Sequence, residues 1–189
     1  MNLERLSIEL DSILIEDQKF RSEIVALQNQ KSDSVELQRI WEKQRKLDSS
    51  NLVRVEQIIN QINGFPGKSL VGSSASKAAF LVLQHAPIAK QGKYLDIILE
   101  AAKKNELDKG LAAMYHDRYL MYNGKPQIYG TQIRSFDVKN PETGNKEKVN
   151  CIWPIADTTN IDSLRLWNGL IPLKDYLGNF GIVNLTYCD

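Results

Sequence analysis

Residues Leu37–Ile62, LQRIWEKQRKLDSSNLVRVEQIINQI, decide the fold of the first third of the chain. Their apolar positions recur at alternating spacings of three and four, which lines one face of an α-helix. Ser32-Asp33-Ser34 supplies residues that cap the start of this helix. Asn63-Gly64-Phe65-Pro66-Gly67 ends it, because glycine and proline do not continue a helix. The pattern predicts one long helix.

A similar stripe precedes this helix and predicts a second long one. It consists of Leu3, Leu6, Leu10, Ile13, Asp17, Phe20, Ile24 and Leu27. Two such helices joined by a short link most simply form an antiparallel pair. Asp17 interrupts the first stripe and Asn51 the second, so we expect both polar side chains to face the interior or another element.

Shorter helices are predicted after the glycine-rich break. Ala75–Ala86 is almost wholly apolar, which is typical of a buried central helix, and it ends in Gln84-His85 before Pro87. Tyr94–Lys104 and Leu107–Met121 have helical patterns as well.

Strand-like alternation appears only in the last third of the chain. Gln127–Val138 and Lys148–Ile155 flank the turn residues Asn140–Asn145, which predicts a β-hairpin. Two short helices near Ile161–Trp167 and Leu173–Leu177 complete the chain. The fold class predicted is therefore mainly α, a helical bundle with a small antiparallel β-hairpin in the C-terminal third.

The length of 189 residues predicts one domain with a real core. We divide it into a long helical hairpin (1–63), central helices (70–122), the β-hairpin (126–156) and C-terminal short helices (160–180).

Composition limits the classes of partner and compartment. Lys and Arg number 24 and Asp and Glu 23, so no net field favours nucleic acid or an anionic membrane. Cys151 and Cys188 lie far apart and outside any CxxC spacing, which argues against a zinc site and fits reduced thiols. The N-terminal segment is charged and amphipathic, and no apolar run is long enough to span a membrane. These features predict a cytoplasmic protein with small molecules or proteins as partners.

The stretch Pro126-Gln127-Ile128-Tyr129-Gly130-Thr131-Gln132 is the clearest candidate site. It places two amides, a phenol and a hydroxyl around one glycine, whereas a half-buried strand would simply alternate apolar and polar residues. We expect Gly130 to have a backbone conformation, or a close neighbour, that a Cβ would obstruct.

His85 is the candidate general acid or base. It ends the most apolar helix, where the dipole and free carbonyls favour an imidazolium, and Asp17 is a candidate for its orienting carboxylate. An equally weighted alternative is that His85 only caps its helix or fills a polar hole in the core. His116 neighbours Asp117 and Arg118 but points away from them, so we expect it at the surface.

Charged residues on apolar stripes are candidates for recognition of an anion or an amide. Asp17 and Arg21 are spaced to pair on one helix, and we expect both to be buried and bonded outside it. Arginine forks suit carboxylates and phosphates. The alternative is a buried ion network that orients helices and binds nothing. The predicted ligand-binding residues are Arg21, Asn51, Gln84, Asp117, Arg118, Gln127, Tyr129, Gly130, Thr131 and Gln132.

Several established chemistries have no motif in this chain. The sequence contains no HExxH, GxGxxG or GxSxG pattern, and the triplet Gly67-Lys68-Ser69 lacks the upstream glycine that a Walker-type motif requires. Of the residues that bind metals, only His85, Asp17 and Asp117 are candidates, and no spacing supports them. We therefore predict neither a metal nor another cofactor.

The order of short motifs resembles a bacterial family of domains of unknown function, the one numbered 6624. The resemblance spans about Asp17 to Leu177 and implies no activity, since the family has none assigned. Pro87 stands where that family often has an acidic residue, so a role for that carboxylate does not carry over. The motifs are Asp17-Gln18-x-x-Arg21, Asp48-x-x-Asn51-x-x-Arg54, Gly64-Phe65-Pro66 with Gly72, Gln84-His85-Ala86, Asp117-Arg118, Gly124-x-Pro126-Gln127-x-Tyr129-Gly130-Thr131-Gln132, and Arg165 with Gly169-Leu170-x-Pro172-Leu173.

Three hypotheses about function stay open on the sequence. The first is a small enzyme, a hydrolase or transferase acting on an anionic or amide-bearing small molecule, with a pocket around His85 and the Gln127–Gln132 segment. The second is a sensor that binds an anionic ligand in the same pocket without catalysis. The third is a module whose N-terminal helical pair recruits a protein partner.

Overall fold

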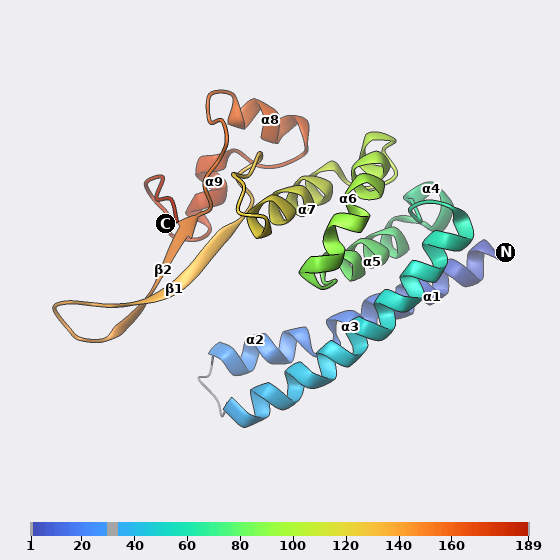
Figure 1. The fold of residues 1–189 in the computed structure, drawn as a ribbon, viewed down its shortest axis with the longest axis horizontal. Coiled ribbons are helices and arrows are strands. Elements are labelled where there is room, and N and C mark those ends of the chain that lie inside the picture. Colours follow the sequence, from blue (N-terminus) through green and yellow to red (C-terminus); the bar gives the residue numbers. More distant parts are fainter. Residues whose placement is uncertain (1, 30–33, 189) are drawn as a thin grey trace. The chain divides into compact units, whose positions relative to one another are not determined.

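A computed structural model describes residues 2–29 and 34–188 of the chain (Figure 1). Over these residues the protein is mainly helical and carries a two-stranded antiparallel sheet in its C-terminal third, which confirms the predicted fold class. The chain forms two compact units, one ending at Leu107 and the other beginning at Asp108. Within the described ranges, no helix combines the length and the apolar character needed to cross a bilayer.

Helices form the framework of the first unit. They are α1 (Leu3–Lys19), α2 (Arg21–Asn29), α3 (Ser34–Ile62), α4 (Lys68–Val71), α5 (Ser73–Gln84) and α6 (Ile88–Lys103). Figure 1 shows α3 returning antiparallel alongside α1 and α2, as the two apolar stripes predict. Of the three predicted cap residues, Ser32 and Asp33 lie outside the described residues, and Ser34 is the first residue of α3.

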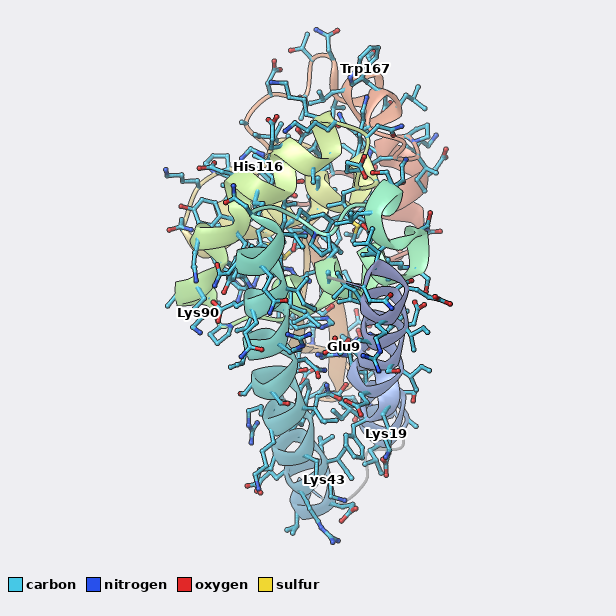
Figure 2. The ribbon with its side chains drawn as sticks, turned by 90° about the vertical axis from the view of Figure 1, so that its right-hand side faces the viewer. Glu9, Lys19, Lys43, Lys90, His116 and Trp167 are labelled. Atoms are coloured by element: carbon cyan, nitrogen blue, oxygen red, sulfur yellow. A yellow bond between two sulfur atoms is a disulfide. The ribbon has the colours of Figure 1, made fainter. Side chains whose placement is uncertain are left out.

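The prediction of one uninterrupted first helix is wrong at Phe20. The backbone N–H of Phe20 donates to the Gln18 carbonyl, so the α-helical ladder stops there and resumes in α2. The amines of Lys19 and Lys43 lie 5.5 and 5.7 Å from the centre of the Phe20 ring, and Figure 2 shows both lysines near the same end of the helices. The apolar spacing continues across the break, which is why the sequence pattern does not reveal it.

The apolar helix α5 is the core of the first unit, as predicted. Phe80 and Leu83 are fully buried, and α1 and α3 both pack against α5. The helix begins and ends two residues earlier than the sequence pattern indicates. α6 begins directly after Pro87, well before the predicted Tyr94. The sequence pattern missed the first turn because that turn is exposed and lacks apolar periodicity.

The second unit combines three helices with the β-hairpin. Its elements are α7 (Lys109–Tyr122), β1 (Ile133–Lys139), β2 (Lys146–Ile152), α8 (Ile161–Trp167) and α9 (Leu173–Gly178). Five buried apolar residues form a core of this unit: Ile152, Ile161, Leu173, Leu177 and Ile182. α8 has the predicted bounds.

The hairpin is shorter than predicted at its base. β1 and β2 pair in the register Ile133 with Ile152 and Phe136 with Val149. The segment Gln127–Gln132 is irregular, apart from one isolated bridge between Gln127 and Ile155. Side chains of the second unit bond to most of the backbone N–H and C=O groups of this segment, so the segment does not continue strand β1.

The prediction of reduced thiols is wrong in this structure, because Cys151 and Cys188 form a disulfide. Their 37-residue separation along the chain says nothing about distance in the fold. Ile152 bridges to Tyr187, and the Cys188 N–H donates to the Ile152 carbonyl, which brings the two sulfur atoms together. The disulfide ties the C-terminal segment to the end of β2.

Candidate functional site

An imidazole and a carboxylate meet in the first unit, where α1 and α5 pack side by side. His85 follows the last residue of α5, and its Nδ1 lies 3.2 Å from Oδ1 of Asp17 in the last turn of α1. Asp17 is 1% exposed, as predicted, while the His85 side chain is 20% exposed and reaches solvent. The pair therefore joins a buried carboxylate to an accessible ring.

Arg21 bridges this pair to a second carboxylate. Its Nε and Nη2 donate to Asp17 Oδ2 and Oδ1 at 3.3 and 3.2 Å, and Nη2 also donates to Asp48 Oδ1 at 2.6 Å. The prediction that Asp17 and Arg21 bond to groups outside their own helix is confirmed, but Arg21 is half-buried instead of buried, with 21% of its side chain exposed. Because two carboxylates neutralise one guanidinium, Arg21 is not free to bind an anion in this arrangement.

Two glutamines complete the cluster. Gln18 Nε2 donates to Asp17 Oδ2 at 2.6 Å, and Gln44 Nε2 donates to Asp48 Oδ1 at 2.7 Å and to the Asp17 carbonyl at 3.1 Å. Gln44 is fully buried, yet its Oε1 has no hydrogen-bond partner in the described part of the chain. Asn51, two turns along the same face of α3, is also buried, and its Nδ2 has no partner among those residues either.

Electrostatics keep Asp17 ionised. Burial raises the pKa of this carboxyl, but hydrogen bonds and charge interactions with His85 and Arg21 act in the opposite direction and outweigh burial. The net result is a pKa for Asp17 below its ordinary value. A carboxylate in this state stabilises any positive charge that forms on the neighbouring imidazole.

In the second unit, Asp117 organises the candidate segment. Its Oδ1 accepts from the N–H groups of Ile128 and Tyr129 at 2.7 and 3.1 Å, and its Oδ2 accepts from the N–H and hydroxyl of Thr131 at 3.0 and 2.9 Å. Asp117 is fully buried. Its oxygen atoms are thus occupied by the segment, and the carboxylate shapes the loop.

The two amides of the segment also bind the chain itself. Gln127 Nε2 donates to the Trp153 carbonyl at 2.6 Å, and its Oε1 accepts from the Gln132 N–H at 2.8 Å. Gln132 Nε2 donates to the Thr131 hydroxyl at 3.0 Å and to the Met114 carbonyl at 3.3 Å. These bonds explain why the segment contains amides without requiring a ligand.

Gly130 has both features predicted for it. Its φ is +68°, and a Cβ built there would lie 2.9 Å from Leu173 Cδ1 and 3.0 Å from Ile155 Cδ1. Fully buried Arg165 lies beneath the same turn, where its Nη1 donates to the carbonyls of Tyr129 and Gly130 at 2.5 and 3.0 Å. The side chains around Gly130 therefore leave no room for substitution.

Arg118 and Tyr129 are the predicted site residues whose side chains this network leaves available. Within the described ranges, Arg118 makes neither a hydrogen bond nor an ion pair, although its Nε is buried. Burial and the nearby Asp117 charge raise the pKa of Tyr129. His116 is half-buried instead of at the surface, and burial lowers its pKa. The centre of its ring lies 6.3 Å from that of Tyr129.

The predicted site residues divide between the two units. His85, Asp17 and Arg21 come together in the first unit, with Asn51 on the nearby face of α3. Gln84 is buried there too, and its carbonyl accepts from Gln91. The residues from Asp117 to Gln132 belong to the second unit.

Sequence reasoning missed three residues that complete these networks. Asp48 and Gln44 occupy successive turns of α3 on the face that carries Asn51, and that spacing was an available signal. Arg165 appeared only as part of a motif, and its short helix, which also contains Asp162 and Ser163, does not mark it as a buried charge.

These features define a mainly helical protein with a buried acid–imidazole cluster in one unit and a carboxylate-organised loop in the other. The model of the Family of unknown function (DUF6624) matches residues 5–181, so the chain belongs to that family. No curated protein and no solved structure matches the chain.

Proposed function

We propose that the protein is a hydrolase or group-transfer enzyme acting on a small molecule, with His85 as the general acid–base and Asp17 as the residue that positions it. The observation that carries this proposal is the 3.2 Å contact between His85 Nδ1 and the buried Asp17 carboxylate. A carboxylate at Nδ1 favours the tautomer with its proton on that nitrogen, which leaves the Nε2 lone pair free.

The chemistry assigned to the pair is proton transfer. Nε2 of His85 takes a proton from an attacking water or hydroxyl group, and Asp17 stabilises the imidazolium that results. The ring then returns that proton to the leaving group, so its protonation state is restored after each turnover. The accessible ring and the ionised Asp17 both support this role.

A panel of p-nitrophenyl esters, phosphate esters and p-nitroanilides tests the proposal. We expect one class to be hydrolysed, with a rate that falls by about 10² to 10⁴ in His85→Gln. His116→Gln is the matched control, because it removes the other histidine and is expected to retain activity. Melting temperatures of both variants should stay near that of the wild type. Undiminished turnover by a folded His85→Gln protein would contradict the proposal.

Binding of an anionic ligand without catalysis is a second candidate, and Arg118 favours it. This guanidinium makes no ion pair within the described residues, in contrast to Arg21. The Gln127–Gln132 segment would then contribute the Tyr129 hydroxyl. Titration with acetate and inorganic phosphate, followed by NMR, should perturb Tyr129 in the wild type but not in Arg118→Gln; equal perturbation in both would remove Arg118 from the site.

Recruitment of a protein partner by the N-terminal helices is a third candidate. Ile8 and Ile15 lie two turns apart on α1 and are 62% and 73% exposed. Single exposed apolar residues are common, so this surface is a weaker signal than the His85 pair. Sedimentation of the wild type and of Ile8→Lys/Ile15→Lys tests whether the partner is a second copy of this chain, and identical behaviour would exclude self-association through this face.

A further inference from the structure

We propose that Asp17, Asp48 and His85 form a binding site for a divalent transition-metal ion such as Zn²⁺ or Mn²⁺. The site shares two residues with the proposed acid–base pair, but it does not require that the protein be an enzyme. It goes beyond the proposed function because it assigns a ligand to the cluster and a role to Asp48.

The three side chains converge from three helical segments of the first unit. Asp17 lies in α1, Asp48 lies in α3, and His85 follows α5, and one ligand atom of each lies within 4.8 Å of the other two. Two ligands of a tetrahedral Zn²⁺, with bonds of about 2.0 to 2.1 Å, are separated by about 3.3 Å. The 3.2 Å between Asp17 Oδ1 and His85 Nδ1 already matches that separation. The Asp48 oxygen lies within 4.8 Å of both atoms.

The type of ligand narrows the choice of ion. Carboxylates suit Mg²⁺, Ca²⁺ and Mn²⁺, whereas imidazole suits Zn²⁺ and other transition metals. A set of two carboxylates and one imidazole therefore favours Zn²⁺ or Mn²⁺ over Mg²⁺. Three protein ligands leave one position of a tetrahedral ion open, which water or one further protein oxygen can fill.

Gln44 offers a further ligand atom to the cluster. Its side chain is fully buried and is directed into the cluster, because Nε2 lies 2.7 Å from Asp48 Oδ1. The Oε1 of the same amide has no hydrogen-bond partner within the described residues. Rotation of the amide by half a turn would direct this oxygen at the cluster, where it becomes a fourth ligand of the kind that hard cations accept.

Charge also favours a cation over an anion at this site. The cluster contains two carboxylates and one guanidinium, so Arg21 leaves one negative charge unbalanced. Arg21 Nη2 contacts oxygen atoms of both carboxylates, which are the same groups that a metal ion would bind. A divalent ion therefore competes with Arg21, whose side chain is partly exposed and has room to turn toward solvent.

Metal binding and the acid–base role exclude each other at one atom. The acid–base state needs a proton on Nδ1 of His85, whereas the metal-bound state uses the lone pair of that nitrogen. Neutral His85 keeps its one proton when an ion binds, because the proton moves from Nδ1 to Nε2 by exchange with water. The metal-bound form is a second state of the same residues.

Calorimetric titration of chelator-treated full-length protein with ZnCl₂ and MnCl₂ tests the proposal. We expect one ion per chain for Zn²⁺ or Mn²⁺, and binding that is at least about tenfold weaker in Asp48→Asn and in His85→Gln. Arg21→Gln should bind about tenfold more tightly, because it removes the competing cation. His116→Gln is the matched control and should bind as the wild type does.

The variants also separate this proposal from the proposed function. Asp48→Asn leaves the Asp17–His85 contact in place, so lost metal binding with retained turnover supports the metal site and the acid–base pair independently. If Arg21→Gln loses stability, its melting temperature should still rise more on addition of Zn²⁺ than that of the wild type does. That larger rise would show the tighter metal binding expected of this variant. Absence of binding in the wild type, or equal binding by wild type and Asp48→Asn, would overturn the metal site.

Discussion

Replacement of Gly130 by alanine should destabilise the second unit by more than the backbone conformation alone explains. The φ of +68° costs an L-residue about 1 to 2 kcal/mol. A Cβ at 2.9 and 3.0 Å from Leu173 and Ile155 adds overpacking of about 1 to 3 kcal/mol. We therefore expect a loss of about 2 to 5 kcal/mol in the free energy of unfolding.

Gly124 is the matched control for this prediction. Its φ of +66° is nearly the same, but a Cβ there would meet no atom within 4 Å. Gly124→Ala should therefore cost only the backbone term, about 1 to 2 kcal/mol. Urea unfolding, followed by the fluorescence of Trp153 and Trp167 in a Trp41→Phe background, reports on the second unit and measures both losses. Equal losses for the two variants would refute the packing argument around Gly130.

Three further predictions concern stability. Asp117→Asn should cost about 2 to 4 kcal/mol by urea unfolding, because an amide nitrogen would face backbone N–H groups that now donate to the Asp117 carboxylate. An unchanged midpoint would refute the role of Asp117 in holding the loop. Asp17→Ala should lose about 2 kcal/mol of stability in thermal unfolding. The loss stays below that of leaving a buried charge unpaired, because Arg21 remains paired with Asp48, and a gain in stability would contradict this prediction. Reduction of the Cys151–Cys188 disulfide by dithiothreitol should cost about 2 to 4 kcal/mol, and identical urea midpoints with and without reductant would show that the bond is not formed in solution.

Local patterns were sufficient for much of the fold. The apolar spacing in α3 depends only on neighbours three and four residues away, so the sequence predicts that helix and its antiparallel partner. Gly130 was predictable for the same reason, since a lone glycine between hydrogen-bonding residues is a local signal of a special backbone conformation.

Features that depend on tertiary contacts were not predictable. The break at Phe20 leaves the apolar stripe in phase. The disulfide depends on the bridge between Ile152 and Tyr187, which no spacing between the cysteines encodes. Asp117 was predicted to bind a ligand, whereas its contacts with backbone N–H groups exist only after the loop has folded.

The candidate site shows the same division. The pairing of Asp17 with Arg21 follows from their spacing on neighbouring helical turns. The contact of Asp17 with His85 was expected from the residue types, and the structure shows it although His85 is remote in sequence. Asp48 joins the cluster only because α3 packs against α1. The second carboxylate of the site therefore comes from tertiary packing.

The tautomer of His85 tests the central claim most directly. Chelator-treated His116→Gln protein contains a single histidine, so ¹⁵N NMR of its imidazole at about pH 8.5, where an ordinary imidazole is neutral, reports on His85 alone. The Asp17 contact predicts a protonated Nδ1 and an unprotonated Nε2, and Asp17→Asn in the same background should reduce that preference. A proton found on Nε2, with the lone pair on Nδ1, would contradict the acid–base account.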